Sequence, residues 1–295
     1  MKPILFALPG NDMLAQRLAQ ELGWEQASAT IRRFPDGESY VRLLSDVAGR
    51  EVVFVGSLDR PDEKFMTLYI AASLAREQGA RRIGLVVPYL AYMRQDSVFH
   101  KGEGQTSVQF GKLLSSFIDW LVTVDPHLHR HQDLAECYSI PTHIVHAAPD
   151  IARWLQQHIE RPLIIGPDAE SEQWAGEVAR LAGAPCIVLE KIRRGDRDVS
   201  VSVPDTDRWR DHTPVLVDDI ASTARTMMSA AEHVLKSGLA KPVCVAVHPV
   251  FADNAFAELQ AMGVGQIVSC NTIVHHSNAI DLVPALAPAV RAMIN

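Results

Sequence analysis

An apolar run that ends in two adjacent carboxylates, Asp218 and Asp219, carries the most chemical information in the sequence. The turn and helix start that follow contain Ser222, Thr223, Ala224, Arg225 and Thr226. The first turn of a helix has unpaired N–H groups and a positive dipole end, and the hydroxyls add donors. A helix cap needs only one such residue. The pattern therefore predicts a phosphate cradle, with carboxylates that accept from sugar hydroxyls or hold Mg²⁺ through water.

A second segment combines an aromatic ring with carboxylates. Phe34 offers a flat face for a purine, and Asp36 and Glu38 could accept hydrogen bonds from an exocyclic amine. The run Phe34-Pro35-Asp36-Gly37-Glu38 also predicts a turn that joins two strands. The two interpretations are compatible.

A cation and an amide follow the predicted buried strand that ends at Pro88. The residues are Arg94, Gln95 and Asp96. A guanidinium at that place can pair with phosphate oxygens, and Gln95 supplies both a donor and an acceptor. From these residues alone, a solvated loop fits equally well.

Histidines alternate after another predicted strand, at His127, His129 and His131. On a strand they would point to one face and suggest a transition-metal site, whereas a helix or loop would scatter them. We favour the scattered arrangement. Asp168 ends a further apolar run, and a basic pair, Lys191 and Arg193, follows the next one. Taken alone, that pair is typical of a solvated hairpin.

Short β-branched runs alternate with helical patterns along the chain, which predicts an α/β protein with mainly parallel sheets. The expected strands are Ile4–Leu8, Val52–Gly56, Ile83–Pro88, Leu121–Asp125, Leu163–Pro167, Cys186–Glu190, Val215–Asp219, Val243–His248 and Ile267–Asn271. The expected helices are Asp12–Leu22, Glu63–Gln78, Thr106–Phe117, Ile151–Ile159, Ser171–Ala182, Thr223–Ser237 and Ala252–Met262. A seam between two similar halves is expected within Pro141–Pro149.

Composition excludes several classes of protein. The chain has 295 residues, 47% of them hydrophobic, and a net charge of −7. These values exclude wholesale disorder and argue against a nucleic-acid-binding surface, which is usually basic. No apolar run reaches the length of a membrane span, and the first residues predict a strand rather than a signal peptide. The four cysteines lack metal-binding spacing, so we expect reduced core thiols in a cytoplasmic protein.

Several segments resemble those of the ribose-phosphate pyrophosphokinase (PRPP synthetase) family, in the same order. Residues 218–226 are similar to the ribose-5-phosphate loop of the type I phosphoribosyltransferase fold. Similar family segments are Phe34–Glu38, Pro88–Asp96, Asp125–His127, Gly166–Ala169, Lys191–Arg193 and His248–Phe251. Phe99-x-x-Gly-Glu103 and Ser222-Thr223 are closer to the archaeal type of the family.

The resemblance implies two similar domains of the type I phosphoribosyltransferase fold, each with a mainly parallel sheet flanked by helices. Residues 1–146 would bind ATP, and residues 147–283 would bind ribose 5-phosphate. A last helix near 284–295 would pack back on the first domain. It also implies a homo-oligomer, in which the Phe34 hairpin reaches into the ATP site of the neighbouring subunit.

The resemblance further implies a reaction, in which MgATP and ribose 5-phosphate give AMP and PRPP. Phe34, Asp36, Glu38, Arg94, Gln95 and Asp96 would bind ATP. Residues Asp218, Asp219, Ser222, Thr223, Ala224, Arg225 and Thr226 would bind ribose 5-phosphate. His127 and Asp168 would hold the Mg²⁺ ion, and Lys191 and Arg193 would be catalytic. The alternative is a catalytically silent homologue that regulates an active partner, although such proteins usually lose these residues.

Two departures from the family pattern concern the sugar site. Arg225 stands where the family often has glycine, so it is strained if that position requires a positive φ and fits if the position is already helical. Glu170 replaces another common glycine and adds negative charge near anionic substrates.

Overall fold

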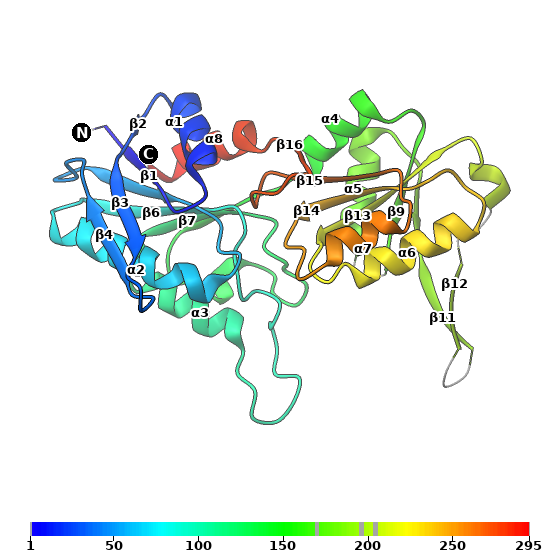
Figure 1. Ribbon diagram of the computed structural model, residues 1–295, viewed down its shortest axis with the longest axis horizontal. Coiled ribbons are helices and arrows are strands. Elements are labelled where there is room, and N and C mark those ends of the chain that lie inside the picture. The colour runs from blue at the N-terminus through cyan, green and yellow to red at the C-terminus, as the bar shows by residue number, and fades with distance from the viewer. Residues whose placement is uncertain (1, 169–170, 195–197, 203–205, 295) are drawn as a thin grey trace. The chain divides into compact units, whose positions relative to one another are not determined.

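The computed structural model divides the chain into two units (Figure 1). The N-terminal unit comprises Met1–His146 with Val283–Asn295, and the C-terminal unit comprises Ala147–Leu282. The structure describes residues 2–168, 171–194, 198–202 and 206–294, and only the backbone between 190 and 206. Each unit is built around its own sheet.

The N-terminal unit contains a six-stranded parallel sheet in the order β2-β1-β5-β6-β7-β8. The strands are β1 (Ile4–Ala7), β2 (Glu25–Gln26), β5 (Glu51–Val55), β6 (Arg82–Val87), β7 (Trp120–Val124) and β8 (Thr142–Val145). Helices α1 (Asp12–Leu22) and α8 (Val283–Ile294) lie on one face, and α2 (Pro61–Glu77) and α3 (Thr106–Ser115) on the other (Figure 1). A short 3₁₀ helix, η1, spans Leu134–Glu136.

The central strands are apolar because helices cover both faces of the sheet. Every residue of β5 and β7 is buried. The buried carboxylate of Glu51, at the start of β5, accepts a 2.7 Å hydrogen bond from the Trp120 indole and lies 3.6 Å from Arg82. A buried charge is tolerated only with such partners.

The C-terminal unit has a second six-stranded parallel sheet, in the order β10-β9-β13-β14-β15-β16. Its strands are β9 (Pro162–Gly166), β10 (Cys186–Val188), β13 (Thr213–Ile220), β14 (Val243–His248), β15 (Gln266–Cys270) and β16 (Asn278–Ile280). Helices α4 (Ala148–His158) and α5 (Glu172–Ala182) cover one face, and α6 (Arg225–Lys236) and α7 (Ala255–Ala261) the other (Figure 1).

The two units repeat one topology. In each, an antiparallel hairpin follows the second strand of the sheet in chain order: β3 (Ala29–Arg33) with β4 (Ser39–Leu43), and β11 (Glu190–Arg194) with β12 (Asp198–Ser202). Helix α8 packs against α1, as α4 packs against α5. The C-terminal helix therefore supplies the N-terminal unit with the helix that precedes the sheet in the C-terminal unit.

The structure corrects several sequence expectations. Helix α6 begins at Arg225 rather than Thr223, because Ala224 has a left-handed φ of 52°. The run expected as one strand is two, β10 and β11, so Lys191 lies on a strand rather than past one. Cys186 is exposed on β10 at the sheet edge and is no core thiol, whereas the other three cysteines are buried.

The α/β class with two mainly parallel sheets is confirmed. Among the described residues, no helix has both the length and the apolar character needed to span a membrane.

Candidate active site

Three carboxylates lie at the edge of the C-terminal sheet that is formed by the carboxyl ends of its parallel strands. Asp218 and Asp219 lie near the carboxyl end of β13, and Asp168 follows β9, the parallel neighbour of β13. The chain adds β10 on one side of β9 and β13 on the other, so the direction of strand addition reverses between β9 and β13. Open α/β sheets bind ligands at such a point. Backbone N–H groups already bind one oxygen of each: Asp218 accepts from Asp219, Asp219 from Ile220 and Asp168 from Ser171.

The electrostatics of this edge are unfavourable for three anions. Burial, followed by the negative charges of Asp219 and Asp168, raises the pKa of the Asp218 carboxyl well above its usual range. The site therefore favours a proton, a cation or a hydroxyl donor at this place.

The turn between β13 and α6 presents an unusual set of free donors. Within the described part of the chain, the main-chain N–H groups of residues 222–227 have no hydrogen-bond acceptor. The carbonyl groups of the turn are instead held by the segment after β14, since Phe251 N–H donates to Ala221 O at 2.7 Å and Ala252 N–H to Ser222 O at 3.0 Å. The donors are thus fixed in place and available to an anion.

The hydroxyls of this turn are also accessible. Thr223 is exposed and Ser222 and Thr226 are half-buried, and none of these hydroxyls is hydrogen-bonded to another described residue. Arg225 is exposed and is the first residue of α6, so of the two alternatives the helical one holds and arginine is not strained there. The positive φ belongs to Ala224.

The sequence-predicted nucleotide residues lie after β6 in the N-terminal unit and differ in exposure. Arg94 is exposed, and no acceptor among the described residues contacts its side chain. Gln95 is half-buried and its Oε1 accepts from Thr106 at 3.4 Å. Asp96 is 3% exposed and binds Arg130 at 2.8 Å. Asp96 therefore supports the loop that presents Arg94.

The hairpin of β3 and β4 presents Phe34 at its tip. A hydrogen bond from Phe34 N–H to Glu38 O closes the turn at 2.8 Å, and Gly37 takes the required positive φ of 94°. The Arg32 guanidinium lies 4.4 Å from the Phe34 ring centroid, a cation–π contact that holds the ring. Phe34 is 39% exposed, and Asp36 and Glu38 are also exposed.

His127 follows β7 on a strained loop. Asp125 and His127 have positive φ values of 32° and 53°, and the His127 Nδ1 lies 3.1 Å from the Nε2 of His129. His131 is buried and turned to a different set of partners. The three histidines therefore do not share one face, as expected for a loop.

Two predicted site elements lie outside the described residues. The side chains of Lys191 and Arg193 are not described, although their backbone is part of β11. Residues 169 and 170, and with them Glu170, are not described.

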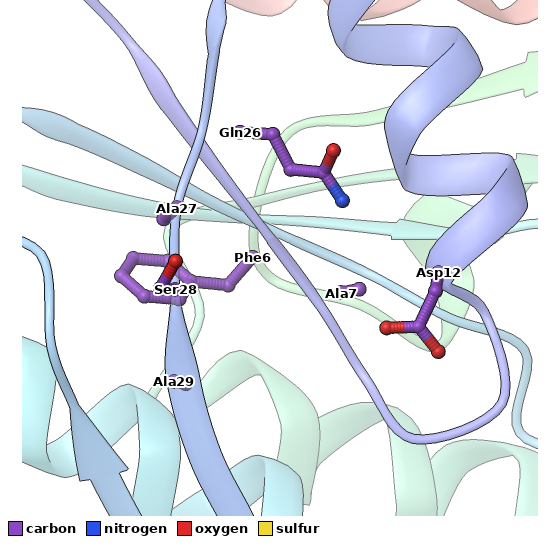
Figure 2. A pocket seen from close by; sticks show the side chains of 7 residues that line it. All are labelled: Phe6, Ala7, Asp12, Gln26, Ala27, Ser28 and Ala29. Carbon is purple, nitrogen blue, oxygen red and sulfur yellow. The ribbon is translucent and has the colours of Figure 1, made fainter.

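Two cavities lie in the N-terminal unit. One, of about 350 Å³, contains no predicted site residue; in Figure 2 the Asp12 carboxylate and the Gln26 amide face it. Its lining is Phe6, Ala7, Asp12, Gln26, Ala27, Ser28 and Ala29. The other, of about 410 Å³, lies beside the nucleotide loop, because Tyr92 and Thr106 line it together with Asp62, Phe65, Gln109, Phe110 and Leu113.

Sequence reasoning missed two residues that support the loop. Arg130 binds the Asp96 carboxylate, and Thr106 donates to Gln95. No local pattern identifies them, because both contacts join segments distant in sequence. A buried carboxylate requires a cationic or hydrogen-bonding partner, but the burial of Asp96 is visible only in the structure.

Fold and site together define a protein with tandem phosphoribosyltransferase-type units. The model of the N-terminal domain of ribose phosphate pyrophosphokinase matches residues 3–116, and that of the phosphoribosyl transferase domain matches residues 142–281. The chain belongs to the ribose-phosphate pyrophosphokinase family, which confirms the resemblance seen in its sequence motifs.

Individual relatives cover almost the whole chain. The ribose-phosphate pyrophosphokinase of Methanopyrus kandleri is 33% identical over 290 residues, 97% of this chain and 98% of the relative. That of Sulfurisphaera tokodaii is 32% identical over 263 residues, 86% of this chain and 88% of the relative. The crystal structure of phosphoribosylpyrophosphate synthetase from Mycobacterium smegmatis has a TM-score of 0.86, with 24% identity and coverage of 100% of this chain and 99% of that one. This last likeness concerns the fold.

Proposed function

We propose that the protein is a ribose-phosphate diphosphokinase, which transfers the β,γ-diphosphoryl group of MgATP to the anomeric hydroxyl of ribose 5-phosphate. The products are PRPP and AMP. Family membership supports the reaction class. The observation that carries the sugar-phosphate half is the row of acceptor-free N–H groups at residues 222–227.

The 5-phosphate binds at this row of donors, with the hydroxyls of Ser222, Thr223 and Thr226 around it. The N-terminal end of α6 adds a favourable dipole, and Arg225 adds a cation. Asp218 and Asp219 accept from the 2- and 3-hydroxyls of the ribose. A hydroxyl donor relieves the crowding of negative charge that raises the pKa of Asp218.

Mg²⁺ fits the donor set at this edge, because hard oxygen ligands are its preference and the negative charges of Asp219 and Asp168 lie beside the buried Asp218 carboxyl. Asp168 and His127 are the proposed ligands, as the family resemblance implies. When bound, the ion neutralises charge on the polyphosphate and holds its oxygens in place.

ATP binds to the loop after β6, where Arg94 pairs with phosphate oxygens and Gln95 adds a donor and an acceptor. The purine stacks on Phe34 from the hairpin of a neighbouring subunit, and Asp36 and Glu38 accept from its exocyclic amine. Arg32 keeps the ring of Phe34 in its orientation. The active form is therefore a homo-oligomer in which two chains complete one ATP site.

In the transfer, the anomeric oxygen of ribose 5-phosphate attacks the β-phosphorus of ATP in line. The bond between the β-phosphorus and the oxygen that bridges it to the α-phosphorus breaks. AMP leaves with that oxygen, and the hydroxyl proton is released. Lys191 and Arg193 neutralise the transferring group and the leaving oxygen. Positioning and electrostatics supply the rate, and no general base is required.

The experiment that tests this function is a product assay with purified protein, ATP, Mg²⁺ and ribose 5-phosphate. We expect AMP and PRPP in equal amounts by chromatography. ATP turnover without PRPP would mean a different acceptor. Nucleotide binding without turnover would favour the silent homologue instead.

Lys191→Ala tests the catalytic assignment. Because Lys191 acts on charge that develops in the transition state, we expect kcat to fall by roughly 10²–10³ with a modest change in KM for ribose 5-phosphate. Lys236→Ala, on the exposed end of α6, is the matched control. A rise in KM alone would assign Lys191 to ground-state binding.

We also propose a cytoplasmic location and no nucleic-acid partner. Four free cysteines and the negative net charge support these two assignments.

A further inference from the structure

A buried imidazole, His131, is surrounded by polar groups behind the nucleotide loop of the N-terminal unit. Its Nδ1 lies 2.9 Å from the Glu136 carboxylate. Its Nε2 lies 3.2 Å from Ser107 Oγ, 3.4 Å from Cys137 Sγ and 3.5 Å from Gln105 Nε2. We call these five residues the His131 cluster. None of them belongs to the ATP-binding set implied by the family resemblance.

The partners of the ring determine its hydrogen-bonding roles. The Glu136 carboxylate can only accept, so Nδ1 carries the proton and donates to it. In the neutral ring, Nε2 is then an acceptor, and it faces the donors of Gln105, Ser107 and Cys137. The bond from His131 lowers the pKa of Glu136, as expected for a carboxylate that accepts.

The cluster is connected to the nucleotide loop through the start of α3. Gln105 Nε2 also donates to the backbone O of Asp96 at 2.6 Å. Ser107 N–H donates to Gln95 O at 3.3 Å. The loop that presents Arg94 is thus held by two residues that His131 in turn holds.

The cluster has the residue types of a nucleophile–histidine–acid triad but not the exposure. Ser107 is 0% exposed and Cys137 is 4% exposed. Burial raises the pKa of the Cys137 thiol, which disfavours the reactive thiolate. No substrate can reach these groups, so the cluster acts on structure rather than on chemistry.

We infer that His131 is a positioning residue for the nucleotide loop, which acts through Gln105 and Ser107 to hold the backbone of residues 95 and 96. This inference rests on the proposed function, because it assigns the loop to ATP. It predicts that the Nε2 acceptor, rather than the Nδ1 donor, determines the affinity for ATP.

Two isosteric variants separate these roles. In His131→Gln the amide oxygen stands near the place of Nε2 and keeps an acceptor for Gln105 and Ser107. In His131→Asn the amide stands near the place of Nδ1 and keeps only the contact to Glu136. His131→Ala removes both, and His143→Gln, at the exposed position of β8 in the same unit, is the control.

We expect His131→Asn and His131→Ala to raise KM for ATP about ten-fold, with kcat and KM for ribose 5-phosphate within about two-fold of wild type. His131→Gln should lie within about three-fold of wild type for every parameter. Thermal unfolding is measured for each variant, and kinetics are taken well below the lowest transition.

Gln105→Ala provides the second measurement and does not depend on the histidine variants folding well. It should raise KM for ATP by a similar factor, and the double variant with His131→Ala should be no worse than either single one. Additive effects, equal rises in both KM values, or unchanged KM for ATP would each overturn the inference. If wild type makes no PRPP, it is the proposed function that fails, and direct ATP binding then tests the His131 cluster by itself.

Discussion

Asp218 stands out among the side chains of the site because its environment opposes its charge. Burial and the neighbouring Asp219 and Asp168 raise the pKa of its carboxyl. A raised pKa means that the native state binds this proton more tightly than the unfolded chain. Stability therefore falls as pH rises from about 4, the ordinary value, to the raised value, and the full cost is present above it.

The first prediction follows for Asp218→Asn, which removes the ionisable group and keeps the shape. At neutral pH the variant should unfold a few degrees above wild type, and the difference should vanish as pH falls toward about 4. At the same time KM for ribose 5-phosphate should rise at least ten-fold, because the amide is a weaker acceptor for ribose hydroxyls. Calorimetry across pH and steady-state kinetics measure both effects.

Asp211→Asn is the control for this variant, since Asp211 is exposed and its ion pair with Arg161, at 3.5 Å, lies on the surface. Added Mg²⁺ should reduce the difference between wild type and Asp218→Asn by stabilising the three-carboxylate edge. A variant less stable than wild type at neutral pH would show that Asp218 is already compensated in the native protein.

At the scale of single residues, type and position predicted chemistry but not exposure. Arg94 and Asp96 are two positions apart and were assigned one role, yet Arg94 is exposed and Asp96 is buried against Arg130. The difference arises from a contact between segments 34 positions apart. A local pattern contains no information about such a partner.

Among the elements, the turn from β13 into α6 has the clearest internal test. Ala224 holds a left-handed φ of 52°, whereas Arg225 is helical. A left-handed residue with a Cβ costs roughly 1–2 kcal/mol relative to glycine. In a helix, glycine costs up to about 1 kcal/mol relative to other residues.

Glycine should therefore have opposite effects at these neighbouring positions. We expect Ala224→Gly to raise the free energy of unfolding by about 1 kcal/mol and Arg225→Gly to lower it by about 0.5 kcal/mol. Denaturant unfolding of the two variants measures this, and each is the control of the other. If Arg225→Gly is the stabilising change, the turn has the conformation that a glycine at position 225 would require.

The sequence predicted elements well where burial on both faces imposes a continuous apolar run, as in β5 and β7. It did not predict β8 or β16, because these edge strands have only four and three residues, mix polar with apolar side chains, and obtain their hydrogen bonds from a neighbour. The predicted helix starts were each displaced by two residues at α2 and α6, where Arg60 and Ala224 precede the helix in a left-handed conformation. Neither arginine nor alanine is a residue type that predicts a left-handed conformation.

At the scale of the whole molecule, the two units share one topology, but only the C-terminal unit is proposed to bind the sugar phosphate. In both sheets, the direction in which successive strands are added reverses after the second strand, so the reversal point lies between β1 and β5 in one sheet and between β9 and β13 in the other. In the N-terminal unit, the side chain of buried Asn11 accepts from Ser57 N–H at 3.3 Å across that point. In the C-terminal unit the corresponding point presents Asp168 and Asp218. The two units therefore share a strand order, but different side chains lie at the point where such sheets bind ligands.

Helix α2, which begins at Pro61 in the N-terminal unit, is less suited than α6 to bind a phosphate at its first turn. Its first turn carries Asp62 and Glu63, and proline lacks the N–H donor that a phosphate requires. The corresponding first turn of α6 has no acidic residue. This difference supports the proposed assignment of the sugar phosphate to the C-terminal unit and of the nucleotide to the N-terminal unit.

The last prediction concerns how chains combine. In the proposed oligomer, an ATP site takes Arg94 from one chain and Phe34 from its neighbour. Phe34→Ala and Arg94→Ala should each reduce activity strongly when every chain carries the change. In a mixed dimer, one of the two sites combines wild-type Phe34 with wild-type Arg94. Random mixing of equal amounts should then restore about a quarter of wild-type activity, since half the dimers are mixed and half their sites are intact.

Co-expression of the two variants with different tags, followed by assay of the unfractionated mixture, measures this restoration. The doubly purified mixed dimers, with one intact site of two, should show about half of wild-type activity. Mixed oligomers of Arg94→Ala with itself, differently tagged, are the control for purification and exchange. Activity of the mixture equal to the sum of its components would mean that each hairpin serves its own chain. The exposure of Phe34 at a hairpin tip, where Arg32 and Tyr40 contact its ring, would then need another explanation, such as stacking on ATP within one chain. Restoration would instead tie the catalytic competence of the N-terminal unit to assembly.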